Sequence, residues 1–214
     1  EEVAELLRFE DDFFDSVEEK RACLATYCDR VSHHVSGKKI MVPADGLADG
    51  LKKMEVRMKE TLRQKEWLSG VRSFFNGYYD NNGRRVENSL SDIRMMLTGQ
   101  VFAVMSGTAS NEQVEQIVQA ADAYLYDEKR GGYSLNTDFH EVKEDLGRMF
   151  GFAYGHKENG AVFSHMAVMF GNALYQRGFA KAGYKALNTL YRQASNVEVS
   201  KIYPGVPEYF NDKG

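Results

Sequence analysis

A run of twelve residues, 154–165, holds a density of reactive side chains that is unusual for a loop without a function. It contains Lys157, Glu158, Asn159 and His165 together with two glycines, and an apolar segment follows it. Glycine allows positive φ and a close approach of the backbone to a ligand. A cation beside a carboxylate offers charge-assisted donors and acceptors to hydroxyl groups, and an imidazole can donate to an anion. The run is therefore our best candidate for a site that binds a hydroxyl-rich molecule and an anion.

The same residue types also allow a structural interpretation. Glu158 could lie near a helix N-terminus, where the helix dipole favours a carboxylate, and His165 could be a buried residue whose hydrogen bonds are satisfied. Arg148, nine residues before Lys157, could make a two-pronged contact with phosphate or with Glu158, or could form an ion pair with Asp145. The residues alone leave these alternatives open.

Further candidates lie earlier in the chain. Gln100 falls within a segment that otherwise looks like core, so its amide must find partners, either in a cleft as a substrate ligand or in helix packing. Tyr78 and Tyr79 could stack on a sugar ring, and Trp67 could do so with less support. Aromatic residues of this kind more often pack in a core or a hairpin.

Composition excludes several classes of protein. The net charge of −4 over 214 residues gives no overall attraction to nucleic acid or to an anionic membrane, so a bound anion must be held by a local cluster. Cys23 and Cys28 point to different faces of a helix, so we expect no disulfide between them. His33 and His34 face different ways on a helix and have no nearby ligand partners, so we expect no metal site. Without a membrane-length apolar stretch or a signal peptide, the chain is expected to be cytoplasmic.

The pattern of residues favours an all-α fold, because prolines number only 3 and strong helix formers dominate long stretches. We expect a single domain over residues 1–214. The turn residues at 80–83 predict a short β-hairpin near 74–86, a glycine pair breaks the chain at 131–132, and residues 139–153 are expected to form a loop. The helices expected from apolar spacing and capping residues span approximately 2–32 with a break near Phe14, 44–67 after Pro43, 90–105, 111–126 after a capping box that begins at Ser110, 161–176 and 180–193.

Several motifs resemble glycoside hydrolase family 94, the inverting disaccharide phosphorylases. The sequence Lys157-Glu158-Asn159-Gly160, followed by an apolar stretch, a phenylalanine and His165, is similar to a signature of that family. Segments 75–83, 97–102, 131–139 and 202–209 resemble, in that order, the branch that acts on β-1,2-linked glucans. The resemblance covers roughly residues 50 to 214 and implies that the chain is part of an (α/α) six-hairpin toroid.

The resemblance also implies a reaction. Phosphate attacks the anomeric carbon of the sugar with inversion while a carboxylic acid protonates the departing oxygen, so β-1,2-linked gluco-oligosaccharides would give α-glucose 1-phosphate. It places Lys157 and Glu158 at the sugar and His165 at the phosphate, to which we add Asn159 as a further sugar ligand and Arg148 as a second phosphate ligand. The expected partners are an oligosaccharide and inorganic phosphate as co-substrate, with no other cofactor.

One part of the family's site has no counterpart in this sequence. The general acid of the family lies in an Asp-Trp-Asn-Asp-like segment upstream of the region that matches, and no such segment is present here. We therefore expect no catalytic residue in this chain, which would be an inactive fragment of the barrel of a larger glycosyltransferase-type phosphorylase. It would associate with the rest of that enzyme and could form a homo-oligomer.

Two other functions remain open. The chain could be the phosphorylase-like C-terminal region of a cyclic β-1,2-glucan synthase, which an upstream membrane-spanning glycosyltransferase region would reveal. It could also be a non-catalytic helical domain that binds carbohydrate, in which case sugar binding would not depend on phosphate.

Overall fold

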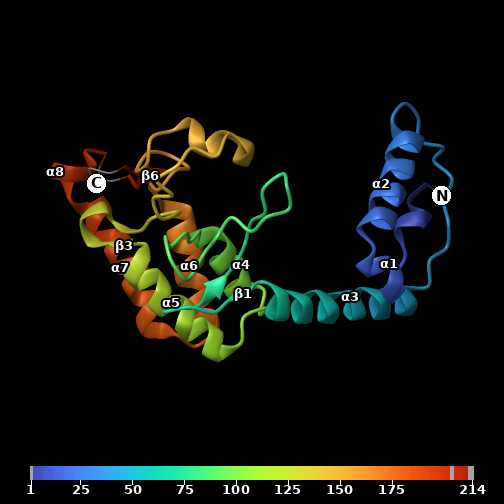
Figure 1. Cartoon of the computed structure of the whole chain (residues 1–214), viewed down its shortest axis with the longest axis horizontal. Helices are drawn as coiled ribbons and strands as arrows, with labels where there is room; N and C mark the ends of the chain where they lie inside the picture. Colours follow the sequence, from blue (N-terminus) through green and yellow to red (C-terminus); the bar gives the residue numbers. More distant parts are fainter. Residues whose placement is uncertain (1, 203–204, 212–214) are drawn as a thin grey trace. The chain divides into compact units, whose positions relative to one another are not determined.

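The computed structural model describes residues 2–202 and 205–211, and Figure 1 shows its elements. The chain divides into two compact units, Glu1–Thr61 and Leu62–Gly214, which we describe one at a time. Most of the described secondary structure is helical, which confirms the expected all-α class. The single domain expected over the whole chain stays a prediction, and Tyr203 and Pro204 of the 202–209 motif lie outside the described residues.

The first unit consists of short helices and the larger part of one long helix. The expected break near Phe14 is confirmed, because a new helix begins at Val17 and the side chain of its N-cap, Ser16, accepts a hydrogen bond from the Glu19 amide at 3.1 Å. The next helix starts directly after Pro43, as expected. The elements are the 3-10 helix η1 (Glu2–Leu6), α1 (Asp11–Asp15), α2 (Val17–Val31) and α3 (Ala44–Lys65), the last of which continues into the second unit.

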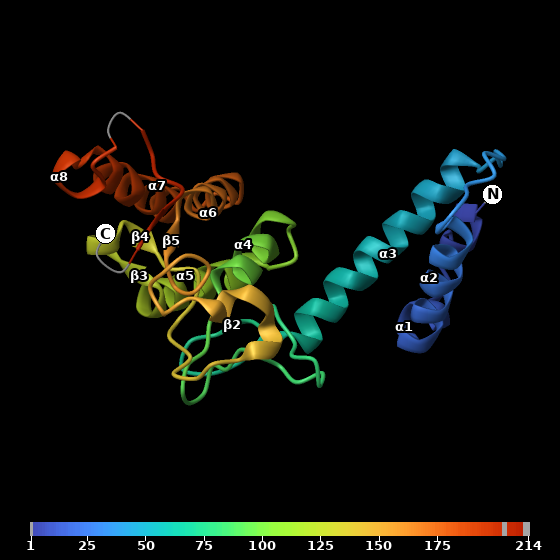
Figure 2. The same cartoon turned by 90° about the horizontal axis from the view of Figure 1, so that it is seen from above.

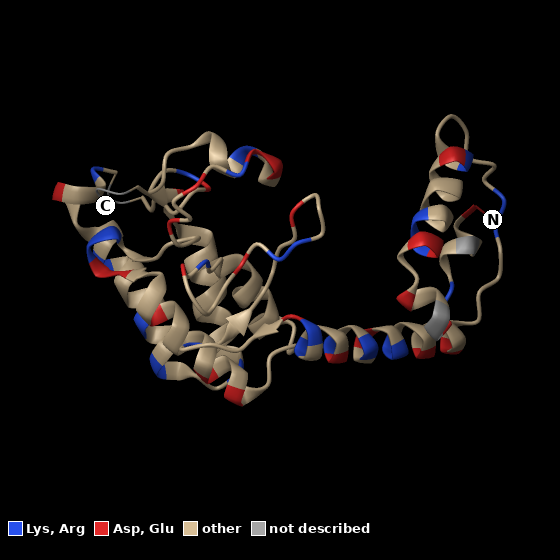
Figure 3. Ribbon diagram, in the orientation of Figure 1, with Lys and Arg blue, Asp and Glu red and all other residues tan. Residues whose placement is uncertain are grey.

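Helix α3 carries charges of both signs along its length (Figure 3). Glu55 accepts from Lys52 at 2.7 Å and from Lys59 at 2.6 Å. Exposed pairs three or four residues apart support a helix by a few tenths of a kcal/mol each, about 0.3–0.5. This face of the helix is therefore well suited to solvent and offers no single-sign surface for a charged polymer.

The second unit contains the remaining long helices. The capping box at Ser110 is confirmed, because Ser110 Oγ accepts from the Gln113 amide at 3.2 Å and Gln113 Oε1 accepts from the Ser110 amide at 3.0 Å. The helices are α4 (Leu97–Met105), α5 (Asn111–Tyr124), α6 (Ser164–Gln176), α7 (Ala180–Ser195) and α8 (Val197–Ser200), with the 3-10 helices η2 (Glu128–Arg130) and η3 (Glu144–Gly151).

Helices α6 and α7 form a hairpin and lie side by side in both views (Figures 1 and 2). Their backbones approach closely at two glycines: a Cβ on Gly183 would lie 2.9 Å from the carbonyl oxygen of Gly171. Only glycine leaves room for this contact. The hairpin is a helical pair of the kind that a toroid repeats.

Within the described residues, three short antiparallel strand pairs connect the helices. The hairpin expected near 74–86 is present: Tyr79 bridges Arg85, and the Gly83 amide donates to the Asp80 carbonyl at 3.0 Å. The strand pairs are β1 (Trp67–Leu68) with β2 (Phe74–Phe75), β3 (Tyr126–Asp127) with β4 (Gly132–Tyr133), and β5 (Val162–Phe163) with β6 (Tyr209–Phe210).

Several expected boundaries were wrong. Residues 90–96 are not helical, and α4 begins only at Leu97, because the Asn88 side chain accepts from the Leu90 amide at 3.0 Å and Asp92 adopts a φ of 47°. Such local side-chain bonds compete with a helix. Strand pairing shortens two other helices, since β5 delays the start of α6 and β3 follows the end of α5. The expected loop at 139–153 contains η3.

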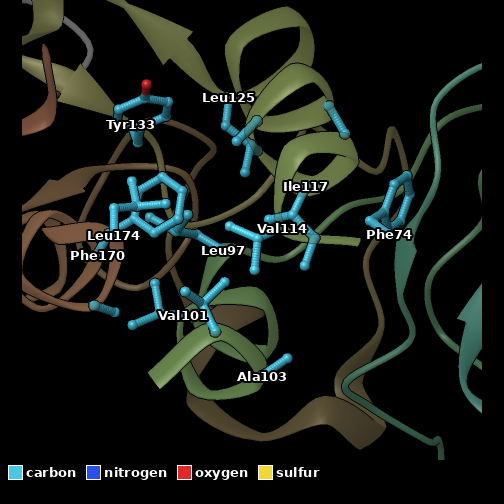
Figure 4. Close-up of a cluster of buried hydrophobic side chains, with 14 of the residues drawn as sticks. Phe74, Leu97, Val101, Ala103, Val114, Ile117, Leu125, Tyr133, Phe170 and Leu174 are labelled. Atoms are coloured by element: carbon cyan, nitrogen blue, oxygen red, sulfur yellow. The ribbon is translucent and has the colours of Figure 1, made fainter. Parts of the chain in front are cut away.

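The main hydrophobic core of the second unit lies where α4, α5 and α6 meet β2 (Figure 4). Phe170 of α6 meets Tyr133 edge-on, with ring centroids 5.3 Å apart. The fully buried members that Figure 4 labels are Phe74, Leu97, Val101, Val114, Ile117, Tyr133, Phe170 and Leu174. Met95, two residues before α4, belongs to the same core, and Phe163 of β5, the strand that leads into α6, packs against it.

Candidate functional site

The segment 152–161, which we call the signature loop, has an ordered backbone of its own. The Gly155 amide donates to the Asn159 carbonyl at 2.7 Å, and the Asn159 amide donates to the His156 carbonyl at 3.0 Å. Lys157 stands between them with a φ of 45°, in the left-handed region that non-glycine residues rarely adopt. Because hydrogen bonds on both sides fix this turn, the side chains of Lys157 and Glu158 are presented from a defined backbone.

Asn159 is the buried member of the loop. Its Nδ2 donates to the Phe152 carbonyl at 2.9 Å, and its Oδ1 accepts from Asn136 Nδ2 at 3.1 Å. Both ends of the amide are therefore used inside the protein, as buried polar groups require. This geometry belongs to a scaffold residue, and the sugar contact expected for Asn159 stays a prediction.

Two cations and one carboxylate surround the exposed side of the loop. Arg148 Nη2 lies 3.2 Å from Glu158 Oε1, so the arginine pairs with Glu158 rather than with Asp145. The Arg148 guanidinium lies 5.3 Å and Lys157 Nζ 5.1 Å from the centre of the Phe152 ring, distances typical of cation–π contacts. The structure thus brings Arg148, Lys157 and Glu158 together, which is one of the alternatives that the sequence left open for Arg148.

Glu158 has one oxygen in an unusual state. Its side chain is 36% exposed, yet Oε2 is buried and accepts no hydrogen bond from any residue that the structure describes. A carboxylate oxygen without a donor loses free energy that a suitable donor restores. The ion pair with Arg148 occupies Oε1, so Oε2 is the oxygen that remains for another donor.

His165 is the second residue of α6 and is exposed, so the buried, satisfied histidine that the sequence also allowed is wrong. Its ring stands edge-on to Phe163, with centroids 6.0 Å apart and planes at 88°. Ser164 anchors the same turn, because its Oγ donates to the Pro207 carbonyl at 2.6 Å. The imidazole is therefore accessible at the start of a helix, where the dipole favours an anion.

Gln100 shows the packing geometry that the sequence left open. It is fully buried; its Oε1 accepts from the Phe75 amide at 2.9 Å, and its Nε2 donates to the Phe75 carbonyl at 2.7 Å. The Gln100 side-chain amide thus pairs with the backbone of β2 as a neighbouring strand would, and it has no free donor for a ligand. A sugar contact by Gln100 stays a prediction without geometric support.

A pocket of about 540 Å³ lies beside Phe75 and Gly99, and several of its polar groups already have protein partners. Glu66 accepts from Tyr79 Oη at 2.7 Å and from Asn76 Nδ2 at 3.1 Å, and Ser106 Oγ lies 2.8 Å from Thr108 Oγ1. The complete lining combines these polar residues with a larger number of apolar ones: Leu62, Glu66, Phe75, Asn76, Gly77, Tyr78, Met96, Thr98, Gly99, Phe102, Ala103, Ser106 and Thr108. A sugar needs unpaired polar partners, so this pocket is a poorer candidate than the signature loop, and stacking by Tyr78 stays a prediction.

Sequence reasoning missed Glu87, a buried carboxyl behind the pocket wall. It accepts hydrogen bonds from the amides of Gly77 and Met96, the latter at 2.7 Å, and so joins the loop after β2 to the start of α4. These segments touch closely, because a Cβ on Gly77 would lie 3.0 Å from the Cα of Gly99. Glu87 lies among charged residues in the sequence, and nothing in that pattern marks it as buried.

Stability should depend on pH through Glu87. Burial raises the pKa of its carboxyl from the ordinary 4.5 to about 8, against the two backbone donors, which lower it. The folded state then holds a proton that the unfolded state has released, so this contribution is present below pH 4.5 and is lost as pH rises to about 8. Urea unfolding between about pH 5 and 8 should show a free energy of unfolding that falls by up to about 1.4 kcal/mol per pH unit through this group.

The variant Glu87→Gln isolates that effect. It is expected to be less stable at low pH, because an amide nitrogen accepts no hydrogen bond and one of the two backbone donors therefore loses its acceptor. It is also expected to lose the part of the slope that comes from Glu87. The exposed Glu115→Gln serves as the matched control and should keep the wild-type slope. An unchanged slope in Glu87→Gln would show that the carboxyl does not titrate in this range.

The fold and the site together describe a largely helical structure that presents a charged loop beside a helix start. Residues 43–208, more than half of the chain, match the family described as "Glycosyl hydrolase 94 superfamily, catalytic domain". The chain belongs to this family. Its helical architecture with short strand pairs fits a part of the α/α toroid of that family.

Three curated relatives are all phosphorylases by name. A solabiose phosphorylase of Paenibacillus borealis is 32% identical over 122 residues, which cover 56% of this chain and 15% of the relative. A cellobionic acid phosphorylase of Neurospora crassa is 32% identical over 85 residues (40% and 11%). An N,N'-diacetylchitobiose phosphorylase of Vibrio proteolyticus is 30% identical over 113 residues (52% and 14%). The chain thus matches only a small part of each relative's length.

Two properties of the described residues bear on partners. No helix among them is long and apolar enough to cross a bilayer. Within the same residues, no three His, Cys, Asp or Glu side chains gather as a group that could hold a metal ion.

Proposed function

We propose that this chain supplies the sugar- and phosphate-binding part of the active site of a cytoplasmic glycoside phosphorylase. The full enzyme cleaves β-1,2-linked gluco-oligosaccharides with inorganic phosphate and, with inversion, forms α-glucose 1-phosphate. Membership of the family and three relatives named as phosphorylases support the reaction class. The observation that carries the proposal is the pair Lys157 and Glu158 on an ordered loop, with one Glu158 oxygen left without a donor among the described residues.

In this proposal the two charged residues grip sugar hydroxyls. Glu158 Oε2 accepts from a hydroxyl while Arg148 holds Oε1, so the carboxylate stays oriented before the sugar arrives. Lys157 donates to a neighbouring hydroxyl oxygen. Hydrogen bonds that involve a charged group are about twice as strong as neutral ones, which suits a ligand that offers many hydroxyls and no charge.

His165 is the first phosphate ligand in this proposal. Its imidazole is exposed at the start of α6, and a protonated ring presents two donors to the phosphate oxygens. Arg148 is the second phosphate ligand that we propose, and its present ion pair with Glu158 makes it the weaker choice. Phosphate brings its own negative charge to the anomeric carbon, so the site needs no general base. The general acid comes from another part of the enzyme, and the isolated chain is inactive.

The β-1,2 linkage rests on the motif segments that resemble that branch. The named substrates of the three relatives are solabiose, cellobionic acid and N,N'-diacetylchitobiose, so the linkage must be tested directly. We expect sophorose to bind the chain more tightly than cellobiose or N,N'-diacetylchitobiose in calorimetric titrations. Equal or tighter binding of either competitor would overturn the linkage and leave the reaction class standing.

The role of phosphate can be tested in the same calorimetric titration. Phosphate should strengthen sophorose binding to the wild-type chain, and His165→Ala should remove this coupling while keeping sugar binding in the absence of phosphate. His140→Ala, which replaces an exposed histidine of another loop, is the matched control. Sugar binding without any phosphate coupling would instead favour a non-catalytic carbohydrate-binding domain.

A further inference from the structure

We propose that Asn136 is a positioning residue for the sugar site and that it acts through the signature loop. This inference rests on the proposed function for its link to sugar, while the contacts that support it are independent of that function. Asn136 is fully buried and lies outside the loop, twenty-one residues before Lys157 in the sequence. Its amide joins the loop to the core of the second unit.

The Asn136 side chain reaches the loop at two adjacent residues. Its Oδ1 accepts from the Gly160 amide at 2.8 Å, and its Nδ2 donates to Asn159 Oδ1 at 3.1 Å. The second Nδ2 hydrogen serves the Thr137 carbonyl at 2.9 Å. The Asn136 carbonyl accepts from Tyr154 Oη at 3.3 Å. Every polar atom of the amide is used, and most of these bonds end in the loop.

The other side of Asn136 is fixed to the start of α4. Asn136 bridges Met96, and the Leu97 amide donates to the Leu135 carbonyl at 2.7 Å. The Leu135 amide in turn donates to the Ala161 carbonyl at 2.9 Å. The segment that carries Asn136 is therefore held between a buried helix and the end of the loop, so its amide is a rigid support.

A continuous set of contacts leads from this support to the charged residues. Asn159 receives the Asn136 bond on one side of its amide and donates to the Phe152 carbonyl from the other. The ring of Phe152 lies against the cations of Arg148 and Lys157. Asn136 thus fixes the position of Asn159, the residue that follows Glu158. Through Asn159 it also fixes Phe152, whose ring lies beside Arg148, the ion-pair partner of Glu158.

The conformation of Lys157 explains why the loop needs such a support. A φ of 45° is unfavourable for a lysine and persists only where the surroundings impose it. The bonds to Asn159 and Gly160 fix the chain immediately after Glu158. Without them Lys157 can relax to negative φ, which turns both charged side chains away from their present positions.

Hydrogen exchange tests whether Asn136 holds the loop. In Asn136→Ala, the Gly160 and Asn159 amides should exchange at least ~10-fold faster than in wild type, because local opening no longer breaks the Asn136 bonds. Asn76→Ala is the matched control, since Asn76 is a buried amide that bonds Glu66 and the Glu87 amide and touches no loop residue in those bonds. It should lose stability without faster exchange in the loop. Unchanged exchange in a folded Asn136→Ala, or equal acceleration in the control, would overturn the support role.

A second variant tests the same hydrogen bonds if the alanine variant does not fold. Asn136→Asp retains the oxygen that accepts from Gly160 and loses the donor to Asn159. Protection of the Gly160 amide should then survive, while the Asn159 side-chain amide should show increased mobility in NMR spectra. A folded aspartate variant in which both groups behave as in wild type would overturn the proposal.

Kinetics of the full-length protein that carries this chain test the link to sugar. Asn136→Ala should lower kcat/KM for the oligosaccharide by up to about 10²-fold, the scale expected for a misplaced binding group, while KM for phosphate changes less than about 2-fold. Suppose that the wild-type enzyme is active and that Asn136→Ala exchanges faster but keeps its sugar kinetics. This result would refute the role of Asn136 in positioning the sugar site and would leave its support of the loop standing. A wild-type protein that acts on no glucan would refute the proposed function and with it the sugar role of Asn136, and the exchange data would still decide whether Asn136 supports the loop.

Discussion

Replacing Glu158 with Gln is expected to weaken binding of β-1,2-linked gluco-oligosaccharides by about 10- to 150-fold. This factor corresponds to the loss of a hydrogen bond to a charged group, about 1.5–3 kcal/mol. The amide keeps the shape of the side chain, but it loses the charge that pairs with Arg148 and makes Oε2 a strong acceptor. Calorimetric titration of sophorose into the 214-residue chain measures the effect.

Two further variants make that result specific. Glu115→Gln changes an exposed glutamate on α5 and should leave sophorose binding unchanged. Arg148→Gln removes the partner of Oε1 and should weaken sophorose binding less than the Glu158 change, because the carboxylate remains. If Glu158→Gln bound sophorose as tightly as a wild-type chain that binds it, Glu158 could not be a sugar ligand.

The largest expected loss of stability comes from Phe170→Ala. Phe170 is fully buried on α6, meets the Tyr133 ring edge-on, and lies in the core where α4, α5 and α6 meet. Truncation of a buried phenylalanine removes its burial energy and leaves a cavity, at a cost of about 3–5 kcal/mol. Urea unfolding of the chain should show this decrease in the free energy of unfolding.

The α4 residue Phe102 provides the matched control, because this residue is 48% exposed. Phe102→Ala should cost far less than Phe170→Ala, and Phe170→Leu should fall between them because it refills part of the cavity. Similar losses for Phe102→Ala and Phe170→Ala would mean that the core of the second unit does not lie where the structure places it.

Local signals in the sequence predicted much of the fold. The capping box at Ser110 and the turn at 80–83 carry their own hydrogen-bond partners within a few residues, so sequence alone placed them well. The start of α4 was misplaced for a related reason. Asn88 and Asp92 stabilise a bend in a stretch whose apolar spacing suggested a helix, and spacing does not reveal that competition.

The candidate site was predictable only in its exposed part. Lys157 and Glu158 stand out because charged residues beside glycines are conspicuous in a sequence, and their relation to Arg148 was among the alternatives. The buried residues Asn136 and Glu87 were not predictable as scaffolds. Their partners lie far along the chain, as in the contact of Asn136 with Gly160, and such contacts depend on tertiary structure rather than on any local pattern.

The product that the full-length protein forms from β-1,2-linked gluco-oligosaccharides and inorganic phosphate tests the central claim most directly. NMR of the reaction mixture should show α-glucose 1-phosphate, formed only when phosphate is present and formed more slowly by Glu158→Gln at a subsaturating concentration of the oligosaccharide. Free glucose formed in the absence of phosphate would show hydrolysis. That result, or no reaction with any β-1,2-linked substrate, would contradict the proposed function.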